Sequence, residues 1–214
     1  MPPITLWFLQ ASRCIRSAWL LEELGLRYAV KFSERENGVA PPAFKTAAGG
    51  LGKFPTLQDG ETTVFESGNI TEYLCDNYDK QGRLLPLVGN PKRYEVLQWI
   101  HAAEATWALH GITILYARWH QKDGDVAKTE EGMSGNIRKD MDFLEAALKQ
   151  SKGRFLLGDE VTAADIMMHF SATFVIAREL GVKKGQLPTV EKWLQECEAT
   201  ESYKKAVQTT GHKL

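Results

Sequence analysis

The spacing of hydrophobic residues predicts a β-α-β unit at the start of the chain. Ile4, Leu6 and Phe8 are separated by single residues, which is the alternation of a short strand. Between residues 15 and 24 the apolar positions follow a period of 3.6 residues, which indicates a helix, and residues 28–32 alternate again. Two parallel strands need a crossover connection, and a helix is the usual one.

The next segment adds a hairpin and a helix to this unit. A weak helical segment begins at Pro41-Pro42, and two short strand candidates then flank Asp59-Gly60, a dipeptide typical of a hairpin turn. These strands cover residues 56–58 and 63–65. A further helix is predicted from Ser67 to about residue 78. The expected order is therefore β-α-β-α-β-β-α.

Strand patterns nearly vanish after Lys80. Residues 81–91 contain two glycines and two prolines and are typical of a linker. Later stretches are amphipathic with a helical period, over residues 91–121, 130–149, 163–180 and 189–200. The sequence thus predicts an α/β domain in residues 1–80, a linker in residues 81–91 and an all-helical domain in residues 92–214.

Composition and charge narrow the possible partners. The chain has 214 residues, 43% of them hydrophobic, with 26 Lys and Arg against 27 Asp and Glu, so its formal charge is −1. This balance gives no electrostatic attraction to nucleic acid or to an anionic membrane. The most apolar window, residues 163–177, carries Asp165 and His169 and is too short to span a bilayer. We expect no membrane segment, no nucleic acid and a small molecule as partner.

The cysteines and the start of the chain are typical of an intracellular protein. Cys14, Cys75 and Cys197 are odd in number and far apart, without a CxxC pair or a histidine at ligand spacing. They predict neither a disulfide framework nor a zinc site, and they fit a reducing compartment. No basic region followed by an apolar stretch opens the chain, so no secretory signal is visible. We expect a cytoplasmic location and no metal.

Ser12 lies at the turn between the first predicted strand and helix. Its ordinary role is to cap the helix, because a serine oxygen accepts a hydrogen bond from a first-turn N–H group. The same hydroxyl, together with the positive end of the helix, would also stabilise a thiolate brought by a ligand. The local sequence leaves both interpretations open.

Pro55 lies at the entry of a predicted strand, where proline cannot donate to the sheet. If the Phe54–Pro55 bond is cis, it would present the backbone N–H and C=O of Phe54 to a peptide-like ligand. Cis bonds are found in only about 5% of X–Pro pairs, so the proline alone is a weak indication.

Glu66 and Ser67 close the hairpin and open the next helix. They would serve as a helix cap with an acidic residue beside the positive end of the helix dipole. Alternatively they would bind a zwitterion, with Glu66 pairing an ammonium group and Ser67 and the helix N–H groups taking a carboxylate. Farther along, Thr162-x-x-Asp165 predicts a capping box before an apolar helix, which we interpret as a folding signal.

These four segments, in this order, resemble the cytosolic glutathione transferases over nearly the whole chain. Residues 12–24 are similar to the family's opening Ser-Arg-x-x-Arg-x-x-Trp-Leu-Leu-Glu-Glu-Leu, and residues 52–57 to its Gly-Lys-Val-Pro-x-Leu loop. Residues 66–74 resemble its Glu-Ser-x-x-Ile-x-x-Tyr-Leu segment, and residues 158–166 resemble its capping box. The Trp-Leu-Leu opening is most similar to that of fungal and bacterial members.

The resemblance implies a thioredoxin-like N-terminal domain that binds glutathione, a C-terminal α-helical bundle domain for the second substrate, and a homodimer. By position, Phe54 would bind the cysteinyl backbone of glutathione while Pro55 holds that geometry. Glu66 and Ser67 would hold the γ-glutamyl end, and Lys53 would lie near the other carboxylate.

The resemblance makes Ser12 the first candidate for activating the thiol, because it precedes Arg16 by four residues as the catalytic serine does in several classes. Arg13 or Gln10 could share this role. Cys14 lies two positions after Ser12, which keeps a disulfide-exchanging, cysteine-type enzyme as an alternative.

Three residues with helical spacing are candidates for the second-substrate pocket. Trp107, His110 and Ile114 share one face of a predicted helix. They would form the wall of a site for a hydrophobic electrophile, or they would simply pack in a core.

The predicted activity is attack of the glutathione thiolate on a hydrophobic electrophile, with glutathione as co-substrate, in detoxification or secondary metabolism. Addition to a conjugated double bond, rotation and elimination would instead make the protein a glutathione-dependent cis/trans isomerase. A non-catalytic binding or interaction module with the same fold is the alternative from another class.

Overall fold

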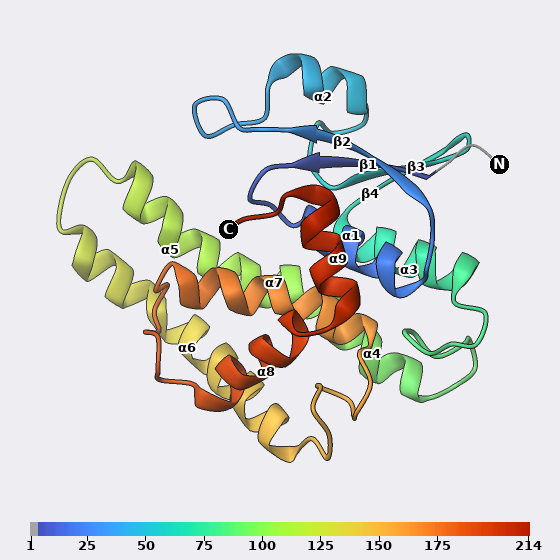
Figure 1. Ribbon diagram of the computed structural model, residues 1–214. Coiled ribbons are helices and arrows are strands. Elements are labelled where there is room, and N and C mark those ends of the chain that lie inside the picture. Colours follow the sequence, from blue (N-terminus) through green and yellow to red (C-terminus); the bar gives the residue numbers. More distant parts are fainter. Residues whose placement is uncertain (1–3) are drawn as a thin grey trace. The chain divides into compact units, whose positions relative to one another are not determined.

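Residues 4–214 are described by the computed structural model in Figure 1. They form two compact units, which we treat separately: residues up to Arg93 together with Ala199–Leu214, and Tyr94–Glu198. The last sixteen residues therefore group with the N-terminal segment, although the sequence predicts them within the helical domain. The functional boundaries at residues 80 and 91 stay predictions.

The first unit has the predicted order of strands and helices, β-α-β-α-β-β-α. Its elements are β1 (Ile4–Leu9), α1 (Cys14–Glu23), β2 (Tyr28–Ser33), α2 (Pro42–Ala48), β3 (Thr56–Asp59), β4 (Thr62–Phe65) and α3 (Ser67–Tyr78). One further helix, α9 (Glu201–Thr210), was not predicted and completes the unit.

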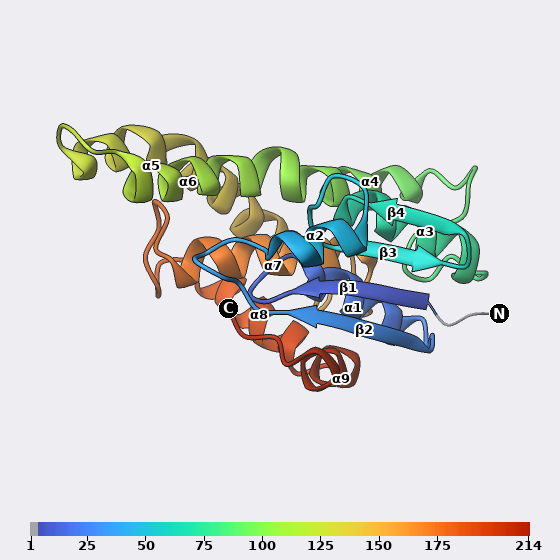
Figure 2. The ribbon, with the colours of Figure 1, turned by 90° about the horizontal axis from the view of Figure 1, so that it is seen from above.

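The four strands form one mixed sheet in the order β2-β1-β3-β4. β1 runs parallel to β2 and antiparallel to β3, and β3 pairs antiparallel with β4. Figures 1 and 2 show α2 over one face of this sheet and α1 and α3 over the other. Because side chains alternate along a strand, Leu6 and Phe8 are fully buried, whereas Trp7 packs against Phe44 of α2 with 5.3 Å between ring centroids.

α9 lies beside α1 and explains why the C-terminal residues belong to this unit (Figure 1). Trp19 of α1 is almost fully buried, and its indole N–H donates to Ser202 Oγ of α9 at 3.0 Å. The Trp19 ring also meets Tyr203 edge to face, with centroids 5.2 Å apart. An aromatic anchor with a satisfied N–H group thus holds the two helices together.

The second unit is entirely helical within the described residues. It contains the segment from α4 (Lys92–Ala102) through the π-helix η1 (Ala103–Ala108) to α5 (Leu109–His120), followed by α6 (Val126–Gln150), α7 (Ala163–Ala177) and α8 (Pro188–Glu198). The sequence predicts one continuous helix over residues 91–121, and the π-helical turn is the difference. A period of 3.6 residues does not distinguish a short i→i+5 segment from the α-helix around it.

α7 is the buried helix of this unit, and the predicted capping box fixes its start. The Asp165 carboxylate accepts the backbone N–H of Thr162 at 2.9 Å and that of Leu156 at 2.8 Å. It also accepts the indole N–H of Trp193 in α8 at 3.0 Å. Asp165 is fully buried, so these bonds replace the water that the carboxylate loses on folding.

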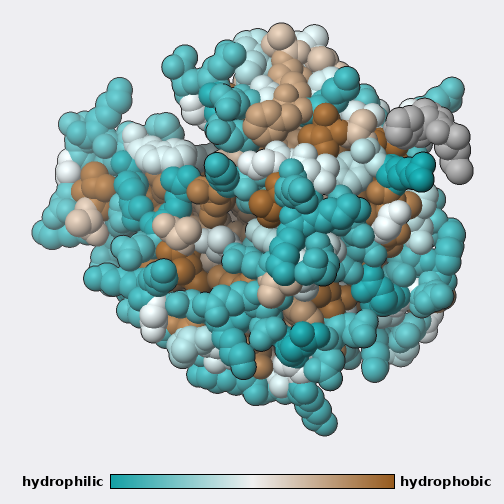
Figure 3. Space-filling view, viewed as in Figure 1, coloured by the Kyte–Doolittle hydropathy of each residue, from teal (hydrophilic) through white to brown (hydrophobic). Residues whose placement is uncertain are grey.

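Hydrophilic residues cover most of the face shown in Figure 3, where hydrophobic residues gather only in small patches. None of the helices in residues 4–214 combines the length and apolarity that crossing a membrane requires.

The connection between α7 and α8 lies tightly against α6. Arg138 of α6 donates from Nε to the Gly181 carbonyl at 2.9 Å and forms a two-bond ion pair with Glu131. Gly181 has a φ of +78°, and a Cβ atom there would lie only 2.5 Å from Cγ2 of Ile137. Glycine is therefore required both by the backbone conformation and by the close approach.

Gly181→Ala is expected to destabilise the chain by about 3 kcal/mol or more, since it combines a left-handed conformation with overpacking. Gly185→Ala is the matched control, because Gly185 also has a positive φ, of +87°, but a Cβ atom there would meet nothing within 4 Å. The control is expected to lose about 1 kcal/mol. Urea unfolding of the two variants measures the difference, and equal losses would refute the close-packing argument.

Candidate functional site

The β1–α1 turn holds Ser12 in a buried position. Ser12 is 6% exposed, its hydroxyl donates to the Leu9 carbonyl at 2.7 Å, and its oxygen accepts the Cys14 N–H at 3.3 Å. Ala11, just before it, has a left-handed backbone with a φ of +47°. Ser12 thus accepts the N–H of the first residue of α1, although the N-cap position itself is Arg13, and its proton is directed to the chain itself. Its catalytic role and that of its half-buried neighbour Arg13 stay predictions.

Cys14 is fully buried next to this turn. Its sulfur accepts the Leu9 N–H at 3.4 Å and donates to the Trp7 carbonyl at 3.6 Å. Burial raises the pKa of the Cys14 thiol to about 11, although the Ser12 hydrogen bond and the positive charge of Arg35 oppose the shift. A protonated and inaccessible thiol does not favour the cysteine-type alternative.

Arg35 binds this turn from the loop that follows β2. Its Nε donates to the Gln10 carbonyl at 3.1 Å, its Nη1 to the Gly38 carbonyl at 3.1 Å and its Nη2 to the Ala11 carbonyl at 3.5 Å. Its backbone N–H also donates to the side-chain oxygen of Gln10 at 3.2 Å. Arg35 was not predicted from the sequence, because a loop arginine after a strand carries no local signal of its partners.

The Phe54–Pro55 peptide bond is cis. A cis bond is the condition under which the sequence predicts that the Phe54 backbone is presented to a peptide-like ligand. Pro55 is buried, and the Phe54 ring stacks on Phe44 of α2 with centroids 4.8 Å apart. Within residues 4–214, neither the backbone N–H nor the C=O of Phe54 has a hydrogen-bond partner. A pair of free, oppositely polar backbone groups on one residue can bind another peptide backbone. Lys53, before it, is exposed.

Glu66 and Ser67 differ sharply in their surroundings. Glu66 is exposed and has a φ of +68°, which is a strained conformation for a residue with a Cβ atom. Ser67, the first residue of α3, is 3% exposed and accepts a hydrogen bond from Nη1 of the buried Arg16 at 3.1 Å. Arg16 lies on α1, so this bond joins the starts of the two helices.

The topology of the first unit brings these segments to one edge of the sheet. Trp7 near the end of β1 pairs with Thr56 at the start of β3, and Thr56 pairs in turn with Phe65 at the end of β4. The turn with Ser12, the loop with Phe54 and the start of α3 therefore follow from neighbouring strand ends.

The three residues predicted for the second-substrate pocket lie in the second unit. Trp107 is 4% exposed and packs with Trp99 and Phe143 at centroid distances of 5.7 and 6.4 Å. Ile114 is fully buried, and Nδ1 of the half-buried His110 lies 2.5 Å from Oδ2 of Asp140. This packing favours the core interpretation of Trp107 and Ile114. Their contact with a substrate stays a prediction.

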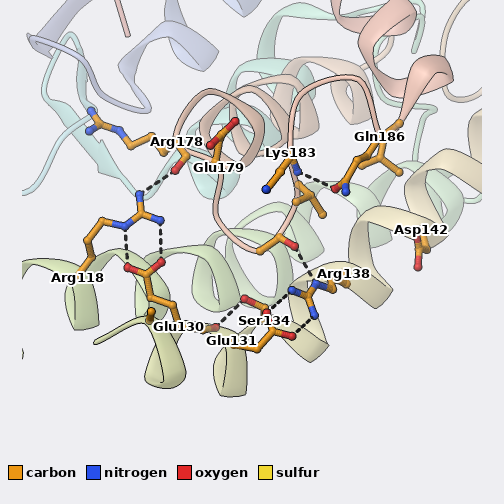
Figure 4. A pocket seen from close by; sticks show the side chains of 14 residues that line it. Arg118, Glu130, Glu131, Ser134, Arg138, Asp142, Arg178, Glu179, Lys183 and Gln186 are labelled. Atoms are coloured by element: carbon orange, nitrogen blue, oxygen red, sulfur yellow. Dashed lines mark hydrogen bonds and ion pairs between the residues drawn. The ribbon is translucent and has the colours of Figure 1, made fainter. Parts of the chain in front are cut away.

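The second unit also contains an open pocket of about 880 Å³ between α5, α6 and the α7–α8 connection (Figure 4). None of the predicted site residues lines it. Arg118 pairs with Glu130 through two hydrogen bonds of 2.8 and 2.9 Å, and Arg138 pairs with Glu131 in the same way. Four cationic and four acidic side chains balance along the walls, so no ligand of one charge is favoured: Arg118, Arg138, Arg178 and Lys183 against Glu130, Glu131, Asp142 and Glu179.

Two domain families match the chain in sequence. The glutathione S-transferase N-terminal domain matches residues 6–83, and the glutathione S-transferase C-terminal domain matches residues 104–201. Among curated relatives, glutathione S-transferase 3 of Schizosaccharomyces pombe is 28% identical over 90% of this chain and 81% of its own. The glutathione S-transferase-like protein OpS6 of Beauveria bassiana is 30% identical over 70% of this chain and 68% of its own. This chain belongs to the glutathione S-transferase family.

The enzyme is therefore a glutathione transferase, and solved structures agree with its fold. A glutathione S-transferase from Actinobacillus pleuropneumoniae has a TM-score of 0.85 at 28% identity, covering 99% of this chain and 94% of its own. A glutathione transferase homologue from Lodderomyces elongisporus, solved with two glutathione molecules per subunit, has a TM-score of 0.78. The Lodderomyces elongisporus structure is 19% identical over 97% of this chain and 99% of its own chain, so this similarity concerns the fold alone.

The cysteines of the transferase are expected to be unreactive in the native state. All three are buried, and burial raises the pKa of Cys14 to about 11, that of Cys75 to about 12 and that of Cys197 well above its usual value. With a pKa near 11, only about one Cys14 thiol in a thousand is ionised at pH 8. Dithionitrobenzoate should react slowly with the folded enzyme. In denaturant it should react readily with all three thiols. A fast reaction that disappears in Cys14→Ser would instead identify Cys14 as a reactive thiol.

Proposed function

We propose that the transferase binds glutathione in its first unit and uses the glutathione thiolate to attack a hydrophobic electrophile. The observation that carries the proposal is the pair of Phe54 backbone groups, beside the cis bond to Pro55, that lack a partner in the described part of the chain. Glutathione contains a cysteinyl residue whose own N–H and C=O would complete two antiparallel hydrogen bonds there. The side chain of that cysteinyl residue then extends away from the shared backbone.

The start of α3 supplies partners for the γ-glutamyl end. The strained conformation of Glu66 leaves its carboxylate exposed, where it would pair with the ammonium group. The first N–H groups of α3 have no partner within the helix, and they would bind the carboxylate together with the Ser67 hydroxyl. Arg16, which donates a hydrogen bond to the Ser67 hydroxyl oxygen, adds positive charge to this subsite. Exposed Lys53 would lie near the glycyl carboxylate.

The glutathione sulfur would then reach the β1–α1 turn, where the family resemblance gives Ser12 and Arg13 as the catalytic candidates. The positive end of α1 favours a thiolate over a thiol, which lowers the pKa of the bound group. Attack on the electrophile needs no covalent intermediate with the protein. The enzyme contributes ionisation and proximity.

The proposal extends to the whole assembly. Residues 1–80 would form the glutathione-binding domain and residues 92–214 the domain for the second substrate. The enzyme would act as a homodimer in the cytoplasm, as the family resemblance implies.

Calorimetric titration with glutathione, followed by the thiolate absorbance of the complex against pH, tests the proposal. We expect saturable binding and a thiol pKa below the value of about 8.5 for a free cysteine thiol. Conversion of model electrophiles would then distinguish conjugation from double-bond isomerisation. The absence of binding would refute the proposal and favour a non-catalytic module.

Glu66→Gln is expected to weaken glutathione binding about 10-fold or more, because the variant loses a charged hydrogen-bond partner of the ammonium group. Glu61→Gln is the matched control, since Glu61 is an exposed glutamate on the β3–β4 turn and has no role in the proposed site. Calorimetry on both variants gives the comparison. If the two affinities equal that of the wild type, the γ-glutamyl assignment fails.

A further inference from the structure

The β1–α1 turn contains a second polar side chain, Gln10, whose amide is fixed in orientation. We propose that Gln10 donates the hydrogen bond that stabilises the glutathione thiolate, and that Arg35 is the positioning residue that holds Gln10 in place. The inference rests on the proposed function and assigns the role of donor to Gln10 in place of Ser12.

The hydroxyl of Ser12 is poorly placed to be that donor. A hydroxyl has one proton, and that of Ser12 is donated to the Leu9 carbonyl at 2.7 Å. Turning it toward a ligand would leave the buried Leu9 carbonyl without its partner, at the cost that an unsatisfied buried acceptor carries. Ser12 is also 6% exposed, which leaves little of it within reach of a ligand.

The amide of Gln10 has the opposite properties. Its oxygen accepts the backbone N–H of Arg35 at 3.2 Å, and a backbone N–H can only donate. The amide is therefore oriented with its NH₂ group directed away from the Arg35 N–H. That NH₂ group has no hydrogen-bond partner among residues 4–214. Gln10 is only partly buried, so two N–H donors are available to a ligand.

Arg35 keeps this arrangement rigid. Its guanidinium bridges the carbonyls of Gln10, Ala11 and Gly38, which joins the turn to the loop after β2. The Gln10 N–H is held as well, because it donates to the Ser33 carbonyl at 2.9 Å. The field of Arg35 also reaches the turn, since it lowers the pKa of the neighbouring Cys14 thiol against the effect of burial.

Gln10 lies at the same end of the sheet as the proposed backbone site. Trp7 pairs with Thr56, so the chain leaving β1 and the chain entering β3 lie side by side at this edge. Gln10 comes three residues after Trp7, and Phe54 comes two residues before Thr56. A cysteinyl side chain held at Phe54 would therefore find the Gln10 amide and the start of α1 nearby.

The test compares Gln10→Met, Ser12→Ala and the wild type as complexes with glutathione. Gln10→Met keeps the length of the side chain and removes both donors, so we expect the pKa of the bound thiol to rise by about one unit, with up to about 10-fold less thiolate at neutral pH. The turnover lost at neutral pH should return at higher pH. In Ser12→Ala we expect the pKa of the bound thiol to stay as in the wild type, while the thermal stability falls.

S-methylglutathione controls for folding, because it uses the same backbone and γ-glutamyl contacts but has no thiol to ionise. We expect its affinity for Gln10→Met to stay within about 2-fold of the wild-type value, since the lost donors meet only the sulfur. Gln10→Glu is the second variant. It keeps the oxygen that accepts the Arg35 N–H, and its negative charge should raise the thiol pKa further than Gln10→Met does.

The role of Arg35 is tested through Gln10. Arg35→Lys keeps the positive charge but loses the planar fork that bridges three carbonyls. Like Gln10→Met, it should therefore raise the pKa of the bound thiol. In the double variant Gln10→Met/Arg35→Lys we expect no further rise, because Arg35 acts through the amide. Additive shifts would overturn the positioning role.

Two results would overturn the assignment of Gln10. One is an unchanged thiol pKa in both Gln10 variants, and the other is a rise confined to Ser12→Ala. In either case glutathione still binds with a lowered thiol pKa in the wild type, and the proposed function stands. If the wild type fails to bind glutathione, the proposed function and this inference are both refuted.

Discussion

The pairing of β1 with a parallel strand on one side and an antiparallel strand on the other is the constraint on which the rest of the first unit depends. Leu9 at the end of β1 pairs with Ser33 at the end of β2, whereas Trp7 pairs with Thr56 at the start of β3. β4 runs antiparallel to β3, so its last residue, Phe65, is also at this edge. Four chain segments that are distant in sequence therefore meet there: the β1–α1 turn, the loop after β2, the loop before β3 and the start of α3.

The same pairing sets the electrostatics of that edge. α1 and α3 both begin there, so the positive ends of two helix dipoles are directed to one region, and the buried guanidinium of Arg16 lies between them on Ser67. A ligand with a carboxylate and an ionised sulfur suits such a region, while the exposed Glu66 offers a negative group for an ammonium. Glutathione has these three charges on one short peptide, which is why the proposed function fits this edge.

Much of this arrangement was predictable from the sequence, because its signals are local. Alternation and helical period predicted the β-α-β-α-β-β-α order, and the proline after Phe54 marked the loop with the cis bond. The contacts that were not predicted are those between segments distant in sequence. Nothing near Trp19 indicates that its partner is Ser202, and nothing near Arg35 indicates the Gln10 turn. Helical spacing placed Trp107 and Ile114 on one face but could not distinguish a pocket wall from a core.

The turn before α1 illustrates how rigidity and chemistry are divided between neighbouring side chains. The left-handed conformation of Ala11 turns the chain from β1 into α1, and the Ser12 hydroxyl satisfies the Leu9 carbonyl that this turn leaves behind. The bond that makes the turn rigid thus uses the one proton that Ser12 could offer. A donor held from outside the turn avoids this conflict, because Arg35 orients the Gln10 amide without using its NH₂ group. Such a preorganised donor needs no rearrangement when charge develops on sulfur, and this is the condition under which a hydrogen bond contributes most to catalysis.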